Sequence, residues 1–239
     1  MHCRVVFSSV EHFSGLLDLY KHVTALTGRP MVKKYDANFF LLGEDILGTA
    51  GEYNPPILYE ALVSFIRNLQ GSIGSRDFVI FSAYTKMGES VLNAVYFIGQ
   101  KQWFFDFKRV PTEGDLSVCG LDMVKWAQNS KLNPKRHLCA KSGEVCIKNL
   151  YLLVCADLSR LHTLRPPKNA LIFVPAGILP KGEVSNLYSL KSSGWVFIND
   201  PAQGVFWHVG MKRPLDKKDF KPIHFEGGDA VPFEFDFAS

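Results

Sequence analysis

The sequence predicts an α/β protein that folds as a single domain around a sheet covered on both faces. Several segments contain four or more consecutive apolar residues, which is typical of strands buried on both sides. Segments with apolar residues at helical spacing lie between some of these strands, and this alternation is typical of α/β folds. The chain has 239 residues, no internal repeat and no obvious linker, so one domain with a large core is expected.

The expected elements follow the chain from a short Val- and Phe-rich strand at its start. Helices are expected at 10–28, which ends at Gly28, and at 55–72, which begins with prolines, because apolar residues recur there every three or four positions. A tight Gly99-Gln100 turn joins two neighbouring strands. The predicted strands are 3–9, 37–44, 77–85, 90–99, 100–107, 149–157, 170–177, 195–200 and 204–210.

The rest of the chain gives weaker signals. Residues 108–141 read as irregular and polar, and residues 183–194 as a short helix. In the last part, Phe alternates with acidic residues in the stretch FEFDF, and this period-2 pattern can add a strand to another chain or to its own sheet edge. We therefore expect residues 1–210 to form the domain. Residues 211–239 are expected to form a C-terminal extension that joins its own sheet or takes part in a dimer contact.

Composition and charge exclude several classes of protein. The chain is 47% hydrophobic and 21% charged, which is ordinary for a folded soluble protein, and no apolar run is long enough to cross a bilayer. The net charge of +4 is mild and the basic residues are scattered, so no nucleic-acid partner is expected. The N-terminus becomes polar too soon for a signal peptide. These features predict a cytoplasmic protein without a membrane span.

The five cysteines are expected to be reduced thiols, because their number is odd and the chain is not small. His137, Cys139 and Cys146 lie close together in the sequence, but their spacing does not match a zinc finger or a zinc ribbon. No metal site is therefore expected.

Candidate functional residues lie at the ends of the predicted strands. Glu44 ends one apolar strand, Cys155 ends another, and a third leads into the small-residue turn Ala176-Gly177. Ligands of open α/β sheets bind beyond the carboxyl ends of the strands, so Glu44 and Cys155 are expected to meet at one edge. A cysteine nucleophile needs a base for its proton and a nearby cation, and Lys135 in the segment KRHL is the candidate cation.

Each of these residues also has an ordinary structural interpretation. Free cysteines are among the most buried residues, a glutamate at a strand end often caps or pairs, and a lysine in a polar loop usually lies on the surface. Asp157 reads as a structural residue that bonds backbone N–H groups in the turn after Cys155. A Cys–His arrangement of Cys155 with His137 or His162 is a further alternative, although no Asn or Asp is placed to orient either ring.

The order of these residues resembles that in the nitrilase superfamily, the carbon–nitrogen hydrolases. FFLLGEDILGT looks like the family's first motif with its glutamate, KRHL like its lysine motif, and LLVCADL like its nucleophile motif. VLNAVYFIG looks like the strand that the family places after the first motif, and ALIFVPAG sits where the family places its next strand. The match therefore spans roughly Arg4 to Gly210. Each motif alone is common, and the order of three on the right kinds of element carries the resemblance.

The resemblance implies a fold and a reaction. The fold is an α-β-β-α sandwich of the nitrilase type, which pairs through helices into a homodimer. The reaction is hydrolysis of a non-peptide carbon–nitrogen bond in a small amide or nitrile, through a thioester on Cys155. Glu44 would act as the base, and Lys135 with the backbone N–H of Ala156 would hold the oxyanion. This chemistry needs no organic cofactor and no metal.

Two further functions remain open on the same fold. An amine in place of water would make the chain an N-acyltransferase that uses the same three residues. A site that has lost its activity would leave a catalytically silent binding or scaffold protein. The reactivity of the thiols distinguishes these cases, because a working site should hold one cysteine far more reactive than the other four.

The sequence also departs from the family's pattern. Gly43 stands before Glu44, where the family usually has proline. Lys135 is only 20 residues before Cys155 (155 − 135), which is short for the family. Glu144 is the only carboxylate between them and is the candidate for the family's second glutamate. These clipped loops predict either an open site for a large substrate or a site that has lost its function.

Overall fold

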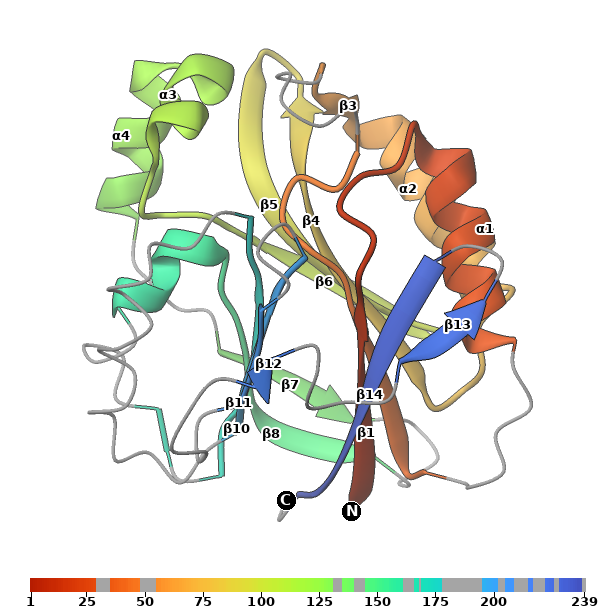
Figure 1. The fold of residues 1–239 in the computed structure, drawn as a ribbon. Coiled ribbons are helices and arrows are strands. Elements are labelled where there is room, and N and C mark those ends of the chain that lie inside the picture. Colours follow the sequence, from red (N-terminus) through yellow and green to blue (C-terminus); the bar gives the residue numbers. More distant parts are fainter. Residues whose placement is uncertain are drawn as a thin grey trace.

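Two β-sheets face each other in the computed structural model, and helices cover the outer face of the first sheet (Figure 1). This layered arrangement confirms the predicted α/β fold class. The structure describes residues 1–28, 35–47, 55–130, 135–139, 145–160, 166–167, 169–177, 195–201, 205–208, 215–216, 222–225 and 228–237.

The first sheet has eight strands and mixes parallel with antiparallel pairs. Strands β1, β2 and β4 run parallel, whereas β4, β5 and β6 form an antiparallel meander. Gly99 pairs with Gln102, so a tight turn joins β5 to β6 as predicted. In spatial order the strands are β13 (Ile223–Phe225), β14 (Gly228–Asp236), β1 (His2–Ser8), β2 (Ala37–Leu41), β4 (Asp77–Met87), β5 (Ser90–Gly99) and β6 (Gln102–Phe107), with the short β3 (Ile57–Leu58) beside β4.

The second sheet has six strands, and its three central strands are parallel. Their C-terminal ends therefore lie at one edge of the sheet, where side chains from different strands can meet. In spatial order the strands are β12 (Leu215–Asp216), β11 (Val205–His208), β10 (Trp195–Asp200), β9 (Leu171–Pro175), β8 (Cys146–Leu152) and β7 (Lys135–Cys139).

Two amphipathic helices, α1 (Leu16–Thr27) and α2 (Tyr59–Gln70), lie on the outer face of the first sheet (Figure 1). The buried residues of α1 recur at helical spacing, as Leu19, Val23 and Leu26 do. Gly28 ends this helix as predicted, and its N–H bonds to the carbonyl of Thr24. The hydrophobic periodicity therefore located both helices correctly.

The continuous apolar runs of the strands arise because both faces of the first sheet are buried. In β1, Val5 and Phe7 belong to the core between the sheets, whereas Val6 packs in the core under the helices. Aromatic rings fill the core between the sheets, and the rings of Phe39 and Phe173 lie 4.9 Å apart. One buried amide also joins the two sheets, because Asn199 of β10 donates to carbonyls of β1 and β2, at Ser8 and Leu41.

The prediction of an irregular segment over residues 108–141 is wrong. The described part contains α3 (Glu113–Cys119), α4 (Leu121–Asn129) and β7. Helix α3 starts at a capping box in which Thr112 and Asp115 satisfy each other's backbone N–H groups, and its only buried residue is Asp115. Because α3 has no apolar stripe, hydrophobic periodicity gave no signal for it. The predicted helix at 183–194 lies outside the described residues.

The C-terminal segment adds a strand to the chain's own sheet. Strand β14 pairs antiparallel with β1, from His2 opposite Asp236 to Ser8 opposite Ala230. The predicted alternation is present, because Phe235 and Phe237 are buried in the core between the sheets while Glu234 and Asp236 are exposed. No helix within the described ranges is long and apolar enough to span a membrane.

Candidate active site

Glu44 lies at the point where the two sheets meet. It follows β2 by three residues, and its N–H bonds to the carbonyl of Ala176, 3.1 Å away, just beyond the end of β9. In return, the N–H of Gly177 donates to Glu44 Oε2 at 3.1 Å. The glutamate therefore reaches across to the turn after β9, and Ala176-Gly177 is part of the site's edge.

Gly43 allows this approach because it has no side chain. A Cβ atom on Gly43 would lie 2.8 Å from Cγ of Pro201, the residue that follows β10. Carbon atoms do not approach so closely without displacement of one of them. This contact gives a physical reason for the glycine in front of Glu44, where the resemblance led us to expect proline.

Lys108 binds Glu44 from the end of β6. Its ammonium lies 2.7 Å from Glu44 Oε1 and 2.9 Å from Asp115 Oδ2, and its side chain is only 3% exposed. Burial by itself lowers the pKa of Lys108, but the carboxylates of Glu44 and Asp115 outweigh it and hold this pKa above its usual range. Lys108 therefore carries a fixed positive charge next to the base.

Asn93 of β5 holds the two carboxylates around this lysine. Its Nδ2 donates to Glu44 Oε1 at 2.8 Å and to Asp115 Oδ1 at 3.0 Å, and its Oδ1 accepts a bond from Ser82. Tyr84 of β4 also donates to Asp115 Oδ1, at 3.0 Å. The position of each carboxylate is thus set by side chains from two adjacent strands.

Asp115 is fixed at the first turn of α3. The N–H and hydroxyl of Thr112 both donate to its Oδ2, at 2.7 and 2.8 Å. Burial raises the pKa of Asp115, but the charge of Lys108 and the bonds from Asn93, Lys108 and Thr112 outweigh that effect and lower it overall. Asp115 therefore stays ionised and balances the lysine together with Glu44.

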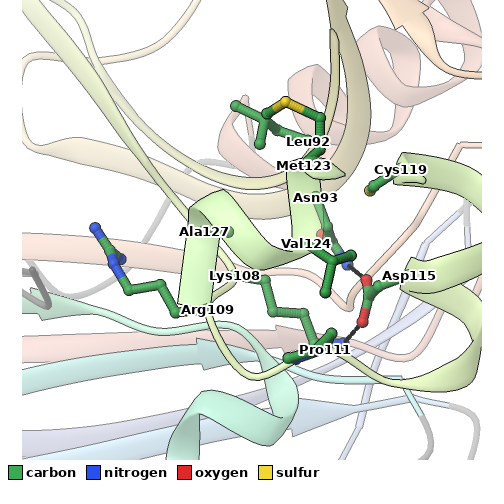
Figure 2. A pocket seen from close by; sticks show the side chains of 10 residues that line it. All are labelled: Leu92, Asn93, Lys108, Arg109, Pro111, Asp115, Cys119, Met123, Val124 and Ala127. Atoms are coloured by element: carbon green, nitrogen blue, oxygen red, sulfur yellow. Dashed lines mark hydrogen bonds and ion pairs between the residues drawn. The ribbon is translucent and has the colours of Figure 1, made fainter. Parts of the chain in front are cut away.

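A small pocket opens beside this cluster, between β5 and the helices α3 and α4 (Figure 2). Its polar end consists of Asn93, Lys108 and Asp115, which Figure 2 shows converging at one side. The remainder of the lining comes from Leu92, Arg109, Pro111, Cys119, Met123, Val124 and Ala127.

Cys155 follows β8 and begins the 3₁₀ helix η1 (Cys155–Arg160). Its φ of 40° lies in the left-handed region, which is uncommon for a residue with a side chain and often marks a functional position. The thiol is buried, and it lies close enough to Glu44 and Lys108 for the charges of both to act on it. Glu44 and Cys155 thus come together as predicted, but from different sheets, because Glu44 follows β2 of the first sheet and Cys155 follows β8 of the second.

The Cys155 thiol is protonated at rest. Burial raises its pKa well above the usual range, the negative charge of Glu44 adds to this, and the charge of Lys108 acts in the opposite direction. A cysteine in this state can act as a nucleophile only if a neighbouring base takes its proton during the attack. Glu44 lies beside the thiol and is the nearby carboxylate that can do so.

The side chain of Asp157 accepts backbone N–H groups as expected, but from another segment and not from the turn after Cys155. Its Oδ1 accepts the backbone N–H groups of Arg109 and Val110, at 2.8 and 2.7 Å. These two residues come directly after Lys108. The aspartate therefore joins the segment of the nucleophile to the segment of the lysine.

The structure does not bring Lys135 to this cluster, and Lys108 lies there instead. Lys135 is exposed at the start of β7, where it pairs with Tyr151 of β8. His137 is exposed on the same strand, at a bulge in the ladder, whereas Glu144 and His162 lie outside the described residues. Asp115, seven residues after Lys108, supplies a second carboxylate beside the lysine.

A signal for Lys108 is present in the sequence. Lys108 comes immediately after the apolar strand WFFDF, just as Glu44 and Cys155 follow apolar strands. Lys135 was predicted because the residues KRHL resemble the family's lysine motif, and this resemblance takes no account of position relative to the end of a strand. Asp115 gave a weaker signal, as the third residue after Thr112 in a helix-start pattern.

Comparison with solved structures identifies the fold. No protein-family model and no curated protein matches the chain by sequence. XC1258 of Xanthomonas campestris, a CN-hydrolase superfamily protein, is 13% identical, with a TM-score of 0.56 over 99% of this chain and 91% of that one. Nit3 of Saccharomyces cerevisiae, a nitrilase-superfamily member, is 13% identical, with a TM-score of 0.58 over 98% and 90%. This chain has the nitrilase fold.

The glutamine-dependent NAD⁺ synthetase of Acinetobacter baumannii gives a further match, with 12% identity and a TM-score of 0.61. It covers 99% of this chain but 46% of the synthetase, so the likeness concerns one part of a longer protein. The same fold is thus found both in chains that it covers almost completely and as one part of a longer protein. At these identities the comparisons show the fold alone, and it is of the type that the motifs predicted.

Proposed function

We propose that this chain is a thiol-dependent hydrolase that cleaves a non-peptide carbon–nitrogen bond in a small amide or nitrile. The observation that carries the proposal is that one carboxylate, Glu44, lies beside the Cys155 thiol and binds the Lys108 ammonium at 2.7 Å, at the junction of the two sheets. A nucleophile, a base and a cation within contact of one another form the set of groups that acyl transfer through a thioester requires. Lys108 takes the role first expected for Lys135.

The first half of the reaction forms the acyl-enzyme. Cys155 Sγ attacks the amide carbon while its proton passes to Glu44, and the negative charge that develops on the amide oxygen is stabilised by Lys108. Glu44 then gives the proton to the leaving nitrogen as the carbon–nitrogen bond breaks. The amine departs, and the acyl group stays on sulfur as a thioester.

The second half returns the free enzyme. Glu44 takes a proton from a water molecule that attacks the thioester carbon, and Lys108 stabilises the second oxyanion. The carbon–sulfur bond breaks, Cys155 regains its proton from Glu44, and a carboxylic acid is released. An amine that attacks in place of water would make the same site an N-acyltransferase.

The test is detection of the acyl-enzyme by intact mass spectrometry after acid quench, with a phenyl ester as activated acyl donor. We expect wild type to gain one acyl group on Cys155, Cys155→Ala to gain none, and Glu44→Gln and Lys108→Met to react at least about 100-fold more slowly. Lys135→Met is the matched control, because it removes an exposed lysine, and it should react as wild type does.

The alternatives give different outcomes in this experiment. If the acyl group passes to hydroxylamine or a primary amine much faster than to water, acyl transfer is the better description. If no donor acylates Cys155, and iodoacetamide labels the five cysteines without preference for it, the silent binding-protein reading replaces the hydrolase. A panel of small amides and nitriles, followed by measurement of ammonia release, then finds the substrate class.

We also propose a homodimer, on the basis of the resemblance. Strand β14 is paired within its own sheet along its contact with β1, so we no longer assign the pairing of two copies to that strand. Analytical ultracentrifugation over a range of protein concentrations tests the proposal. A single species at the monomer mass at all concentrations would rule it out.

A further inference from the structure

The Cys155 and Lys108 segments are joined by a single buried side chain. Asp157 is 1% exposed and lies two residues after Cys155, and its Oδ1 accepts the N–H groups of the two residues that follow Lys108. These donors lie 48 and 47 residues away in sequence. We infer that Asp157 is a positioning residue, which holds the nucleophile and the lysine in register for the reaction proposed above.

The lysine segment, residues 108–110, is also held by contacts with two other parts of the structure. The bonds to Asp157 satisfy the backbone N–H groups that these contacts leave. On one side the N–H of Lys108 bonds to the carbonyl of Asn93 at 2.8 Å, which ties it to β5. On the other side the Arg109 guanidinium binds Asp106 at 2.7 Å and stacks on the ring of Phe107. The backbone N–H groups of residues 109 and 110 are the donors that remain, and both point to Asp157.

The nucleophile segment needs support because its backbone is strained. Cys155 has a φ of 40°, a conformation that costs about 1–2 kcal/mol for a residue with a side chain and persists only where neighbouring contacts impose it. The N–H of Asp157 bonds to the carbonyl of Val154 at 2.9 Å, which closes the turn around Cys155. The side chain of the same residue then anchors that turn to the lysine segment.

Two substitutions separate the hydrogen bonds of Asp157 from its charge. Asp157→Asn keeps an oxygen that can accept both N–H groups, whereas Asp157→Leu has a similar shape and accepts none. The matched control is Asp77→Leu, at the first residue of β4, at the end of that strand away from Tyr84. Asp77 is also a buried carboxylate, and it accepts hydrogen bonds from the backbone N–H of Gly74 and the side-chain amide of Asn38. It contacts none of the site residues, so it tests loss of stability alone.

The first readout is the rate of Cys155 acylation at saturating donor, at a temperature where circular dichroism finds every variant folded. We expect Asp157→Leu to lower this rate about 100-fold, since a displacement of about 1 Å at a reacting group has that effect. The donor concentration at half-saturation should change little, and Asp157→Asn and Asp77→Leu should stay within about threefold of wild type. An unchanged rate in Asp157→Leu, or an equal loss in Asp77→Leu, overturns the inference.

The second readout does not need the proposed reaction. Lys108 favours the thiolate of Cys155, so Lys108→Met should slow labelling of Cys155 by iodoacetamide. This effect should persist when Asp157→Asn is also present and disappear in the Asp157→Leu background, where the two segments are no longer in register. If wild type forms no acyl-enzyme but this pattern holds, the hydrolase proposal fails and the positioning role stands. Equal effects of Lys108→Met in both backgrounds overturn the positioning role.

Discussion

The ammonium of Lys108 lies 2.7 Å from the carboxylate of Glu44, although 64 residues separate them in the sequence. Both groups are more than nine-tenths buried, and Asp115 binds the lysine from its other side. One buried cation therefore serves two buried anions. The arrangement has consequences for stability as well as for chemistry.

Removal of the lysine should destabilise the protein strongly. Lys108→Met leaves Glu44 and Asp115 buried without a compensating charge, so we expect the free energy of unfolding to fall by about 3–5 kcal/mol. Lys135→Met removes a lysine of the same size from an exposed position and should change it by less than about 0.5 kcal/mol. Urea denaturation at pH 7 measures both values. Similar values for the two variants would contradict the ion-pair geometry.

The close contact of Gly43 predicts that even a methyl group disturbs the base. In Gly43→Ala the new Cβ would lie 2.8 Å from Cγ of Pro201, so the turn that carries Glu44 has to shift. We expect a loss of stability of about 1–3 kcal/mol and a fall in the Cys155 acylation rate of about 10–100-fold. At Gly71 the closest atom to a new Cβ is 3.4 Å away, so Gly71→Ala is the control that should change neither quantity appreciably.

The backbone strain at Cys155 can be measured by comparing glycine with alanine. Both Cys155→Gly and Cys155→Ala remove the thiol, but glycine adopts a φ of 40° freely, so Cys155→Gly should be more stable by about 1 kcal/mol. Cys3, buried in strand β1, is the control position, and there the order should be reversed. Cys3→Gly should be less stable than Cys3→Ala by about 0.5–1 kcal/mol, because glycine in a strand interior is less stable than alanine. Thermal denaturation of the four variants decides. The same order at both positions would argue against strain at Cys155.

Asp157 should make stability depend on pH near neutrality. Burial raises the pKa of Asp157 to about 7, despite the bonds from Arg109 and Val110, whereas in the unfolded chain it is near 3.8. The folded state therefore binds the proton more tightly. Its contribution to stability is fully present below pH 3.8, declines as the pH rises, and is lost above about pH 7.

Asp157→Asn keeps the two hydrogen bonds and removes this titration. The free energy of unfolding of wild type should fall between pH 5 and pH 8. That of Asp157→Asn should fall less, and the difference between the two falls should be on the order of 2 kcal/mol. Guanidinium denaturation at several pH values in this range measures the difference. Parallel curves for the two proteins would mean that the carboxyl of Asp157 titrates as it does in the unfolded chain.

The C-terminal strand should be required for the core. The ring of Phe235 lies 4.8 Å from that of Phe197 and 4.9 Å from that of Trp195, and it is buried. Phe235→Ala should therefore lower the free energy of unfolding by about 3–5 kcal/mol, and Phe233→Ala, at a half-buried position, by clearly less. Chemical denaturation tests this. Equal and small losses would mean that β14 is not held in the sheet in solution.

Much of the fold follows from local patterns that the sequence contains. Hydrophobic runs located most strands of both sheets, because a strand buried on two faces needs apolar residues at every position. They gave no signal for β7 or for the short strands β3, β12 and β13. Helical spacing located α1 and α2, because each has one face against the sheet. The meeting of Glu44 and Cys155 was predicted from their places at strand ends, but β2 and β8 lie in different sheets, so the packing of one sheet on the other brings the two residues together.

Only the tertiary structure decided which lysine joins them. Lys135 and Lys108 are both lysines next to a strand, and nothing in their immediate neighbours states how far each lies from Glu44. That distance depends on the meander β4–β5–β6, which brings the end of β6 to the end of β2, and on α3, whose Asp115 is held by a cap rather than by an apolar face. Sequence determines elements through interactions between residues close along the chain, whereas a site made by buried ions depends on contacts between segments that only the packed sheets bring together.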